Sequence, residues 1–194
     1  MISAKTEKTL TKLLSVGSLF VSIFLLTDTN TDPVNVTKLF ALSGLAFSLY
    51  VTMLIFARRQ MFSEAKFPLL ILFILNVWMI VATISSDAPF TQNWYGTYGR
   101  NTGLLTYFSL SAILLAGALI SQVASFTKII KSFLLTGIVN VIYCGWVLAF
   151  GDFIPWNNPY GKILGFLGNP DFISAFLGMF IAACLSYIAS THTP

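Results

Sequence analysis

The stretch FPLLILFILNVWMIVATI, residues 67–84, runs for eighteen residues without a charged side chain. An α-helix needs roughly 20 mainly apolar residues to cross the hydrocarbon core of a bilayer, with about 17 to 25 the usual range. The stretch therefore predicts a membrane-spanning helix. Five other apolar runs in the chain are of comparable length, so we expect six spans. Their predicted limits are residues 10–26, 38–57, 67–84, 102–121, 129–150 and 172–189.

The composition of the whole chain agrees with this prediction. Of its 194 residues, 56% are hydrophobic and 9% are charged, whereas a typical soluble domain carries about 25% charged residues. The mean hydropathy is +0.82. Two cysteines, both inside apolar runs, exclude a disulfide scaffold. The predicted fold is a single all-α, polytopic transmembrane domain over residues 1–194.

The distribution of basic residues predicts which side of the membrane each loop faces. Short cytoplasmic loops are enriched in Lys and Arg. With the N-terminus inside, the inner side carries eight basic residues: Lys5, Lys8, Lys12, Arg58, Arg59, Lys66, Lys128 and Lys131. The outer side carries three: Lys38, Arg100 and Lys162. Both termini are therefore expected in the cytoplasm, and the positive net charge indicates topology rather than nucleic-acid binding.

The first predicted span has two interpretations, because basic residues precede an apolar run that suits a signal peptide. We favour a retained signal anchor, since residues 27–30 offer no small-x-small cleavage site.

Two long connections, residues 85–101 and 151–171, lie on the predicted outer side. Loops of seventeen and twenty-one residues are usually functional or disordered, and the aromatic content of these two argues against disorder. We expect them to lie along the outer membrane interface. Their aromatic residues form either an interfacial belt or a platform that stacks on a glycan: Trp94, Tyr98, Trp156 and Tyr160.

The polar residues of the sequence form no recognisable catalytic motif. His192 is the one histidine and lies in the predicted cytoplasmic tail, and the carboxylates are dispersed, so neither a metal site nor a cofactor is predicted. Asn76 and Asn140 lie near the middle of two spans, where amides usually hydrogen-bond between helices. A role in a substrate cavity is the alternative for both.

The basic and turn residues of the outer loops are the best candidates for a site. Arg100 has a planar guanidinium suited to phosphate, although contact with lipid headgroups at the start of the fourth span is the alternative. Lys162 has the same two interpretations. The segment 168–171, Gly-Asn-Pro-Asp, is a turn signature in which Asp171 is expected to cap the sixth span.

Two motifs in these loops resemble the N-terminal half of the O-antigen ligase and polymerase superfamily. Residues 98–107, YGRNTGLLTY, look like that family's basic or polar residue followed by Gly-Leu-Leu-Thr-Tyr at the start of a helix. Residues 165–177, GFLGNPDFISAFL, are similar to its Gly-Asn-Pro-Asn-Phe turn, with Asp171 in place of the commoner Asn. The order of short inner and long outer loops also fits.

The resemblance implies an integral membrane glycosyltransferase of the bacterial cytoplasmic membrane. Such enzymes move a glycan from undecaprenyl diphosphate to a glycan, lipid or protein acceptor on the outer face, and their essential arginines, histidine and large loop lie in the C-terminal half. The chain is therefore expected to be a fragment of a longer protein, inactive alone, with its catalytic residues unassigned. The residues expected to contact substrate are Trp94, Tyr98, Arg100, Asn101, Lys162, Asn169 and Asp171.

Two other functions stay open. The chain is alternatively a non-catalytic membrane subunit or transporter-like protein whose outer aromatic loops bind a partner or a lipid. A permease with a site at Asn76 and Asn140 is the third possibility, but neither residue lies beside the Gly or Pro of a broken helix.

Overall fold

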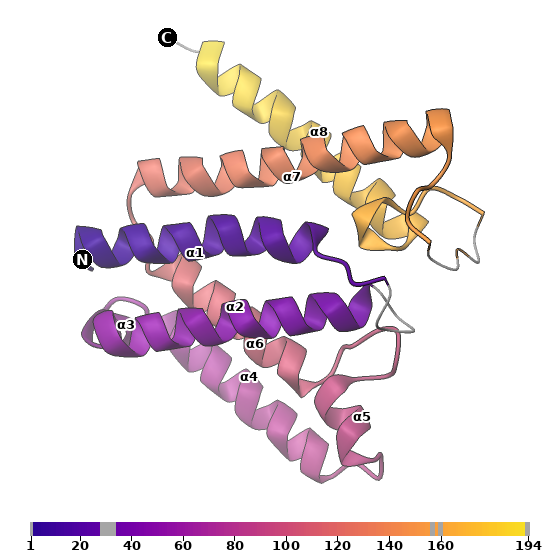
Figure 1. Ribbon diagram of the computed structural model, residues 1–194. Helices are drawn as coiled ribbons and strands as arrows, with labels where there is room; N and C mark the ends of the chain where they lie inside the picture. Colours follow the sequence, from indigo (N-terminus) through magenta and orange to yellow (C-terminus); the bar gives the residue numbers. More distant parts are fainter. Residues whose placement is uncertain (1, 28–33, 156–157, 159–160, 193–194) are drawn as a thin grey trace.

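A computed structural model describes residues 2–27, 34–155, 158 and 161–192, with side chains to residue 189. Every regular element in this part of the chain is helical (Figure 1). The elements are α1 (Ala4–Ile23), α2 (Asn35–Phe56), α3 (Arg58–Ser63), α4 (Lys66–Ile84), α5 (Phe90–Tyr95), α6 (Leu104–Ala118), α7 (Val123–Phe150), the short 3₁₀ helix η1 (Gly165–Leu167) and α8 (Pro170–His192). The predicted all-α fold is confirmed.

Four of the described helices are long and apolar enough to cross a membrane: α2, α4, α7 and α8. The other two predicted spans correspond to α6 and α1. Helix α6 is apolar but has 15 residues, so it is about 22 Å long, shorter than a hydrocarbon core of about 30 Å. Helix α1 carries four charged residues in its N-terminal half. The chain is thus a multi-pass helical protein suited to a lipid bilayer, and the count of six spans and the orientation stay predictions.

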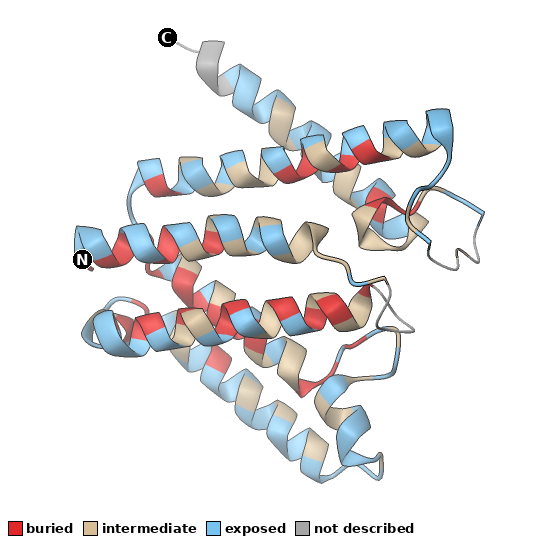
Figure 2. Ribbon diagram, viewed as in Figure 1, coloured by how far each residue is buried: buried red, intermediate tan, exposed pale blue. Residues whose placement is uncertain are grey.

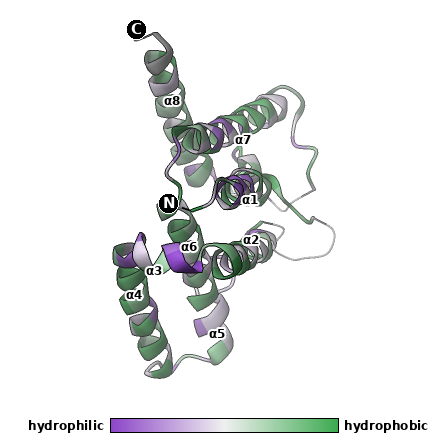
Figure 3. Cartoon of the chain, turned by 90° about the vertical axis from the view of Figure 1, so that its left-hand side faces the viewer, coloured by the Kyte–Doolittle hydropathy of each residue, from purple (hydrophilic) through white to green (hydrophobic). Residues whose placement is uncertain are grey.

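The helices pack in an order that differs from their order in the sequence. Helix α1 lies between α2 and α7, α6 packs on α2, and α4 packs on α6. Helix α8 crosses α7 and extends away from the other helices toward the C-terminus (Figure 1). In the view of Figure 3, hydrophilic residues gather near α3 and the N-terminal end of α1, while the long helices are mostly hydrophobic.

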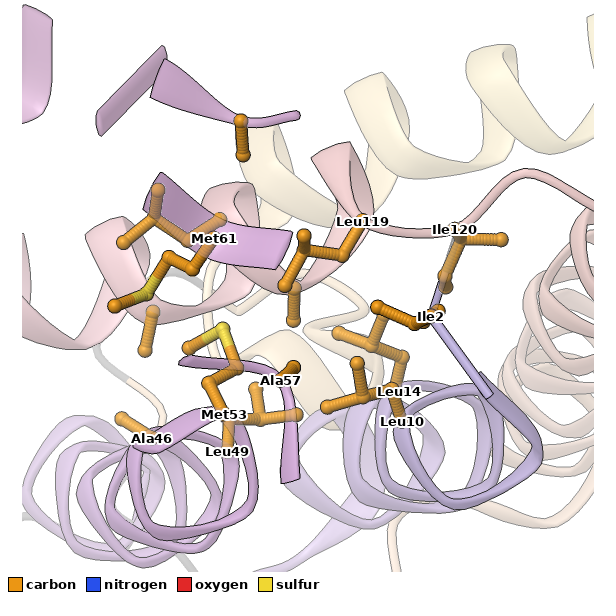
Figure 4. Close-up of a cluster of buried hydrophobic side chains, with 14 of the residues drawn as sticks. Ile2, Leu10, Leu14, Ala46, Leu49, Met53, Ala57, Met61, Leu119 and Ile120 are labelled. Carbon is orange, nitrogen blue, oxygen red and sulfur yellow. The ribbon is translucent and has the colours of Figure 1, made fainter. Parts of the chain in front are cut away.

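The core lies where α1, α2 and α6 meet the turn that contains α3 (Figure 4). Leu10, Leu49 and Met53 are fully buried there. Small residues let the helix backbones approach closely, as is common between helices in membranes: Ala46, Ala57, Ala65, Ala112 and Ala116. The outlying helices are different, because only 6% of the apolar window of α4 and of α8 is buried (Figure 2). Apolar faces of this size are typical of contact with lipid or a partner.

Two charged side chains bind the ends of neighbouring helices. The Glu7 carboxylate of α1 accepts hydrogen bonds from the backbone N–H groups of Ser121 (3.2 Å) and Gln122 (2.8 Å) at the start of α7. The Lys38 ammonium of α2 donates to the carbonyl of Val21 (2.9 Å) at the end of α1. Each charge opposes the dipole of the helix end that it contacts, so both contacts stabilise the position of α1 between its neighbours.

The two asparagines predicted within spans bind different elements. Asn76 Nδ2 donates to Ser111 Oγ at 3.2 Å and thereby links α4 to α6, which confirms its role between helices. Asn140 is fully buried, and its Oδ1 accepts from the backbone N–H of Phe166 in η1 at 3.1 Å. Asn140 lies roughly 15 Å along the helix before the end of α7.

The position of η1 shows how part of the second outer loop packs on the helices. Helix η1 packs against α1, α7 and α8, and Leu164 beside it is buried. The place of the loop at the membrane interface stays a prediction. Irregular backbone that is buried between helices requires its polar groups to be paired within the protein. Asn140 provides that pairing for Phe166, so this part of the loop turns back onto the helices.

Candidate functional site

The first outer motif begins in a closed loop, residues 96–103, whose two ends are glycines in contact. A Cβ atom on Gly96 would lie 2.3 Å from the backbone nitrogen of Thr102, and one on Gly103 would lie 2.3 Å from that of Gly96. Gly96 also has a φ of +87°, which residues other than glycine rarely adopt. Glycine at both positions therefore lets the chain close tightly into one compact loop, residues 96–103.

Hydrogen bonds within this loop and to the next helix fix the backbone of Arg100 and Asn101. The backbone N–H groups of Arg100 and Asn101 both donate to the Thr97 carbonyl at 3.0 Å. The Thr106 hydroxyl donates to the Asn101 carbonyl and thereby joins the loop to the first turn of α6. Arg100 is thus an exposed cation on a loop whose backbone is fixed by hydrogen bonds to Thr97 and to Thr106.

The second outer motif is the turn into α8. Asn169 Oδ1 accepts from the backbone N–H groups of Asp171 (2.8 Å) and Phe172 (3.4 Å), so Asn169 is the N-cap. The prediction that Asp171 caps this helix is wrong, because α8 begins at Pro170 and places Asp171 in its first turn. Proline suits the first helical position, where no intrahelical N–H bond is lost. Asp171 is exposed, and its negative charge offsets part of the positive helix end there.

The two motifs meet in one cavity of about 430 Å³, which we call the Arg100 cavity. Residues of the first loop and residues around the second turn both contribute to its walls. The lining consists of Asn35, Gly99, Arg100, Thr102, Leu167, Gly168, Asn169 and Phe172. Gly168, with a φ of +71°, lies so close to Val34 that a Cβ atom there would be 2.5 Å from the Cγ2 atom of that valine. This contact places the second motif against the start of α2.

The electrostatics of the Arg100 cavity favour an anion. Arg100 is the charged residue of the lining described above. Two helices start in the lining, α2 at Asn35 and α8 immediately after Asn169, and helix N-termini carry partial positive charge. The hydroxyl of Thr102 and the amide groups of both asparagines add hydrogen-bonding atoms. This combination suits a phosphate or a carboxylate.

A second cavity of about 600 Å³, the Tyr98 cavity, adjoins the same loop. Its lining is mostly polar and aromatic, with two apolar residues from α2: Val36, Leu39, Thr91, Gln92, Tyr95, Gly96, Thr97, Tyr98 and Asn101. Asn101 is 8% exposed, and its Nδ2 makes no hydrogen bond within the described part of the chain. A buried donor without a partner costs about 1–3 kcal/mol.

The structure brings only some of the predicted residues together. Arg100 and Asn169 line the Arg100 cavity. Tyr98 and Asn101 line the Tyr98 cavity. These four predicted contact residues therefore belong to two cavities that share one loop.

Trp94, which the sequence predicts to contact substrate, lines neither cavity and packs against other aromatic side chains. Its ring stacks on Phe90 with centroids 5.9 Å apart and meets the edge of Phe108 at 6.3 Å. The contact with Phe108 joins α5 to α6, while the contact with Phe90 lies within α5.

The remaining candidates lie apart from both cavities. Lys162 and Asp171 are exposed and line neither. Trp156 and Tyr160 lie outside the described residues. His192 ends α8, about 30 Å along the helix from Asp171. Among the described residues, no cluster of His, Cys, Asp and Glu suits a metal ion.

Sequence reasoning misses Asn35, Thr102 and Phe172 as lining residues. Thr102 and Phe172 are inside the quoted motifs, next to residues that stand out by their charge or turn type. Asn35 carries no comparable signal, because its place beside the second motif depends on the contact between Gly168 and Val34.

Comparisons with family models, with curated proteins and with solved structures give no match for this chain.

Proposed function

We propose that this chain is the N-terminal part of a bacterial membrane glycosyltransferase of the O-antigen ligase or polymerase type, and that the Arg100 cavity binds the diphosphate of its undecaprenyl-linked glycan donor. One observation supports the proposal above all others. The two sequence motifs that resemble this family are distant in the chain, and residues from both line a single cavity that favours an anion.

The proposed chemistry gives Arg100 a role in stabilising the leaving group. An acceptor hydroxyl attacks the anomeric carbon of the first sugar, and the bond from that carbon to the diphosphate oxygen breaks, with its electron pair leaving on the diphosphate. The guanidinium of Arg100 opposes the negative charge that develops there. The proton of the acceptor passes to a base, which the resemblance assigns to the C-terminal half of such enzymes.

The Tyr98 cavity is the proposed position of the glycan. It adjoins the loop that carries Arg100, and its lining includes the polar residues Gln92, Thr97 and Asn101. Tyr98 is 65% exposed, so its ring is accessible for stacking on a sugar. The two cavities together would hold the diphosphate and the first sugars of one donor on the predicted outer side of the membrane.

The second candidate is a non-catalytic membrane subunit that binds a phosphate-bearing lipid. It is favoured by the lining of the Arg100 cavity, in which the described residues include a cation but no carboxylate or imidazole that would act as a base. Both functions require anion binding at Arg100, so binding is tested first.

The binding test uses the full chain in lipid nanodiscs, with undecaprenyl diphosphate as the ligand and undecaprenol as the uncharged comparison. We expect Arg100→Gln to weaken binding of the diphosphate by roughly 10- to 100-fold, because hydrogen bonds to charged groups contribute about 1.5–3 kcal/mol. Arg100→Lys should lose less, since it keeps the charge but not the planar fork. Arg59→Gln is the matched control, because it removes an exposed arginine from the predicted inner side.

Equal affinity of wild type and Arg100→Gln for the diphosphate would contradict both candidates. A cellular measurement of glycan transfer, with the substitution placed in the full-length protein, then separates them. The enzyme proposal expects transfer to fall with binding in Arg100→Gln, whereas transfer that persists when binding is lost would favour the non-catalytic subunit.

A further inference from the structure

A long apolar groove, which we call the α1–α2 groove, lies between the first two helices and has a volume of about 670 Å³. It shares no lining residue with the Arg100 or Tyr98 cavity. Its lining comes from one face of each helix: Thr9, Lys12, Leu13, Val16, Gly17, Phe20 and Phe24 from α1 and the residue that follows it, and Phe40, Ala41, Gly44, Leu45 and Ser48 from α2.

Two glycines shape the groove in opposite ways. A Cβ atom on Gly17 would lie 2.4 Å from Cδ1 of Leu45, so glycine is needed there for the two helices to approach. A Cβ atom on Gly44 would meet nothing within 4 Å. The missing side chain at Gly44 therefore leaves space that no other part of the described chain fills.

The groove has one polar end. From Lys12 to Phe24 it extends about 18 Å along α1, somewhat more than half of a hydrocarbon core of about 30 Å. The hydroxyls of Thr9 and Ser48 donate to carbonyls of their own helices, at 3.0 and 2.9 Å. Both hydroxyls are therefore already paired, and the rest of the lining is apolar except for Lys12. Lys12 is exposed and is the charged residue of the lining.

We propose that the α1–α2 groove binds one anionic glycerophospholipid, with an acyl chain along Gly44 and the phosphate at Lys12. The apolar lining and the length of the groove fit an acyl chain. Lys5 and Lys8, both exposed on the same end of α1, add positive charge beside Lys12. Complementary charge at this end favours an anionic lipid over a zwitterionic one. The proposal is independent of the glycan donor and of the Arg100 cavity.

The test is native mass spectrometry of the full chain, released from detergent micelles that contain equal amounts of phosphatidylglycerol and phosphatidylcholine. Wild type should retain one phosphatidylglycerol. Gly44→Leu places a side chain in the groove from a Cβ position that meets no protein atom, so we expect retention of that lipid to fall about tenfold. Gly145→Leu is the matched control, because Gly145 is an exposed glycine of α7 whose Cβ atom would also meet nothing within 4 Å.

Lys12→Gln should leave lipid retention in place but reduce the preference for phosphatidylglycerol about fivefold, as expected from one interfacial cation of about 1 kcal/mol. Should Gly44→Leu fail to fold, Ser48→Leu adds apolar volume at another point of the same groove. Unchanged retention in the folded groove variants would overturn the proposal, as would equal retention of the two lipids by wild type. Loss of a dimer in Gly44→Leu would instead assign the groove to a second copy of the chain.

Discussion

Glu7 shows how one residue ties distant parts of this chain together. Its side chain is 2% exposed. Burial raises the pKa of Glu7, but hydrogen bonds from Gln122, Ser125 and Ser121 lower that pKa by more, so the pKa lies below its ordinary value of 4.5. Glu7 precedes the apolar part of α1, so it belongs to the end of the helix rather than to a span.

We expect Glu7→Gln to destabilise the protein by about 1.5–3 kcal/mol at pH 7, because the acceptor loses its charge and an amide NH2 group replaces the Oε2 atom that accepts from the Ser121 hydroxyl. The lowered pKa makes this contribution depend on pH. It is fully present above the ordinary carboxyl pKa and is lost as the pH falls through the lowered pKa of the folded state. Thermal unfolding in detergent at pH 7 and at decreasing acid pH measures both effects.

The variant Glu64→Gln is the control for Glu7, because Glu64 is an exposed glutamate and exposed charges contribute little to stability. It should leave the unfolding temperature nearly unchanged at pH 7. If the difference in stability between wild type and Glu7→Gln stayed constant into strong acid, the charged carboxylate would not be the source of the stabilisation.

At the scale of the helices, α8 depends on a narrow contact with α7. Phe133 and Phe176 meet edge to face with ring centroids 5.4 Å apart. A Cβ atom on Gly137 would lie 2.0 Å from Cδ2 of Phe180. The absence of a side chain at Gly137 therefore lets the Phe180 ring lie against the backbone of α7.

We expect Gly137→Leu to weaken the packing of α8 on α7 and to lower the free energy of unfolding by about 1–3 kcal/mol, the usual cost of overpacking. Titration with SDS in mixed micelles measures the change. Gly145→Leu lies on the same helix in open space and is the control. Equal unfolding curves for the two variants would show that the contact with Phe180 contributes nothing.

At the scale of the whole molecule, the arrangement of basic residues predicts the orientation in the membrane. Ser85 follows α4 on the predicted outer side, and Ser63 ends α3 on the predicted inner side; both are exposed. With Cys144 and Cys184 replaced by alanine, a membrane-impermeant maleimide should label Ser85→Cys in intact cells. It should label Ser63→Cys only after the membrane is permeabilised. The reverse pattern would invert the predicted inner and outer sides.

The predicted spans match the helices because hydropathy is a local property. Each predicted span falls largely within one helix, although α6 is shorter than predicted and α7 begins six residues earlier, at Val123 rather than at residue 129. Hydropathy does not predict how the loops between the helices pack. It does not predict that part of residues 151–171 folds back onto the helices, where the Phe166 N–H group donates to Asn140 Oδ1. A buried amide in a span does not reveal which loop will pair with it.

The helical class, the apolar runs and the two outer motifs can be predicted from the sequence alone, because each depends on residues within about 20 positions of one another. Helix packing selects which of the candidates lie together. Arg100 and Asn169 line one cavity, while Lys162 lies outside it. That difference depends on close contacts between distant segments, such as that of Gly168 with Val34. Such contacts follow from how whole helices pack, which no local pattern specifies.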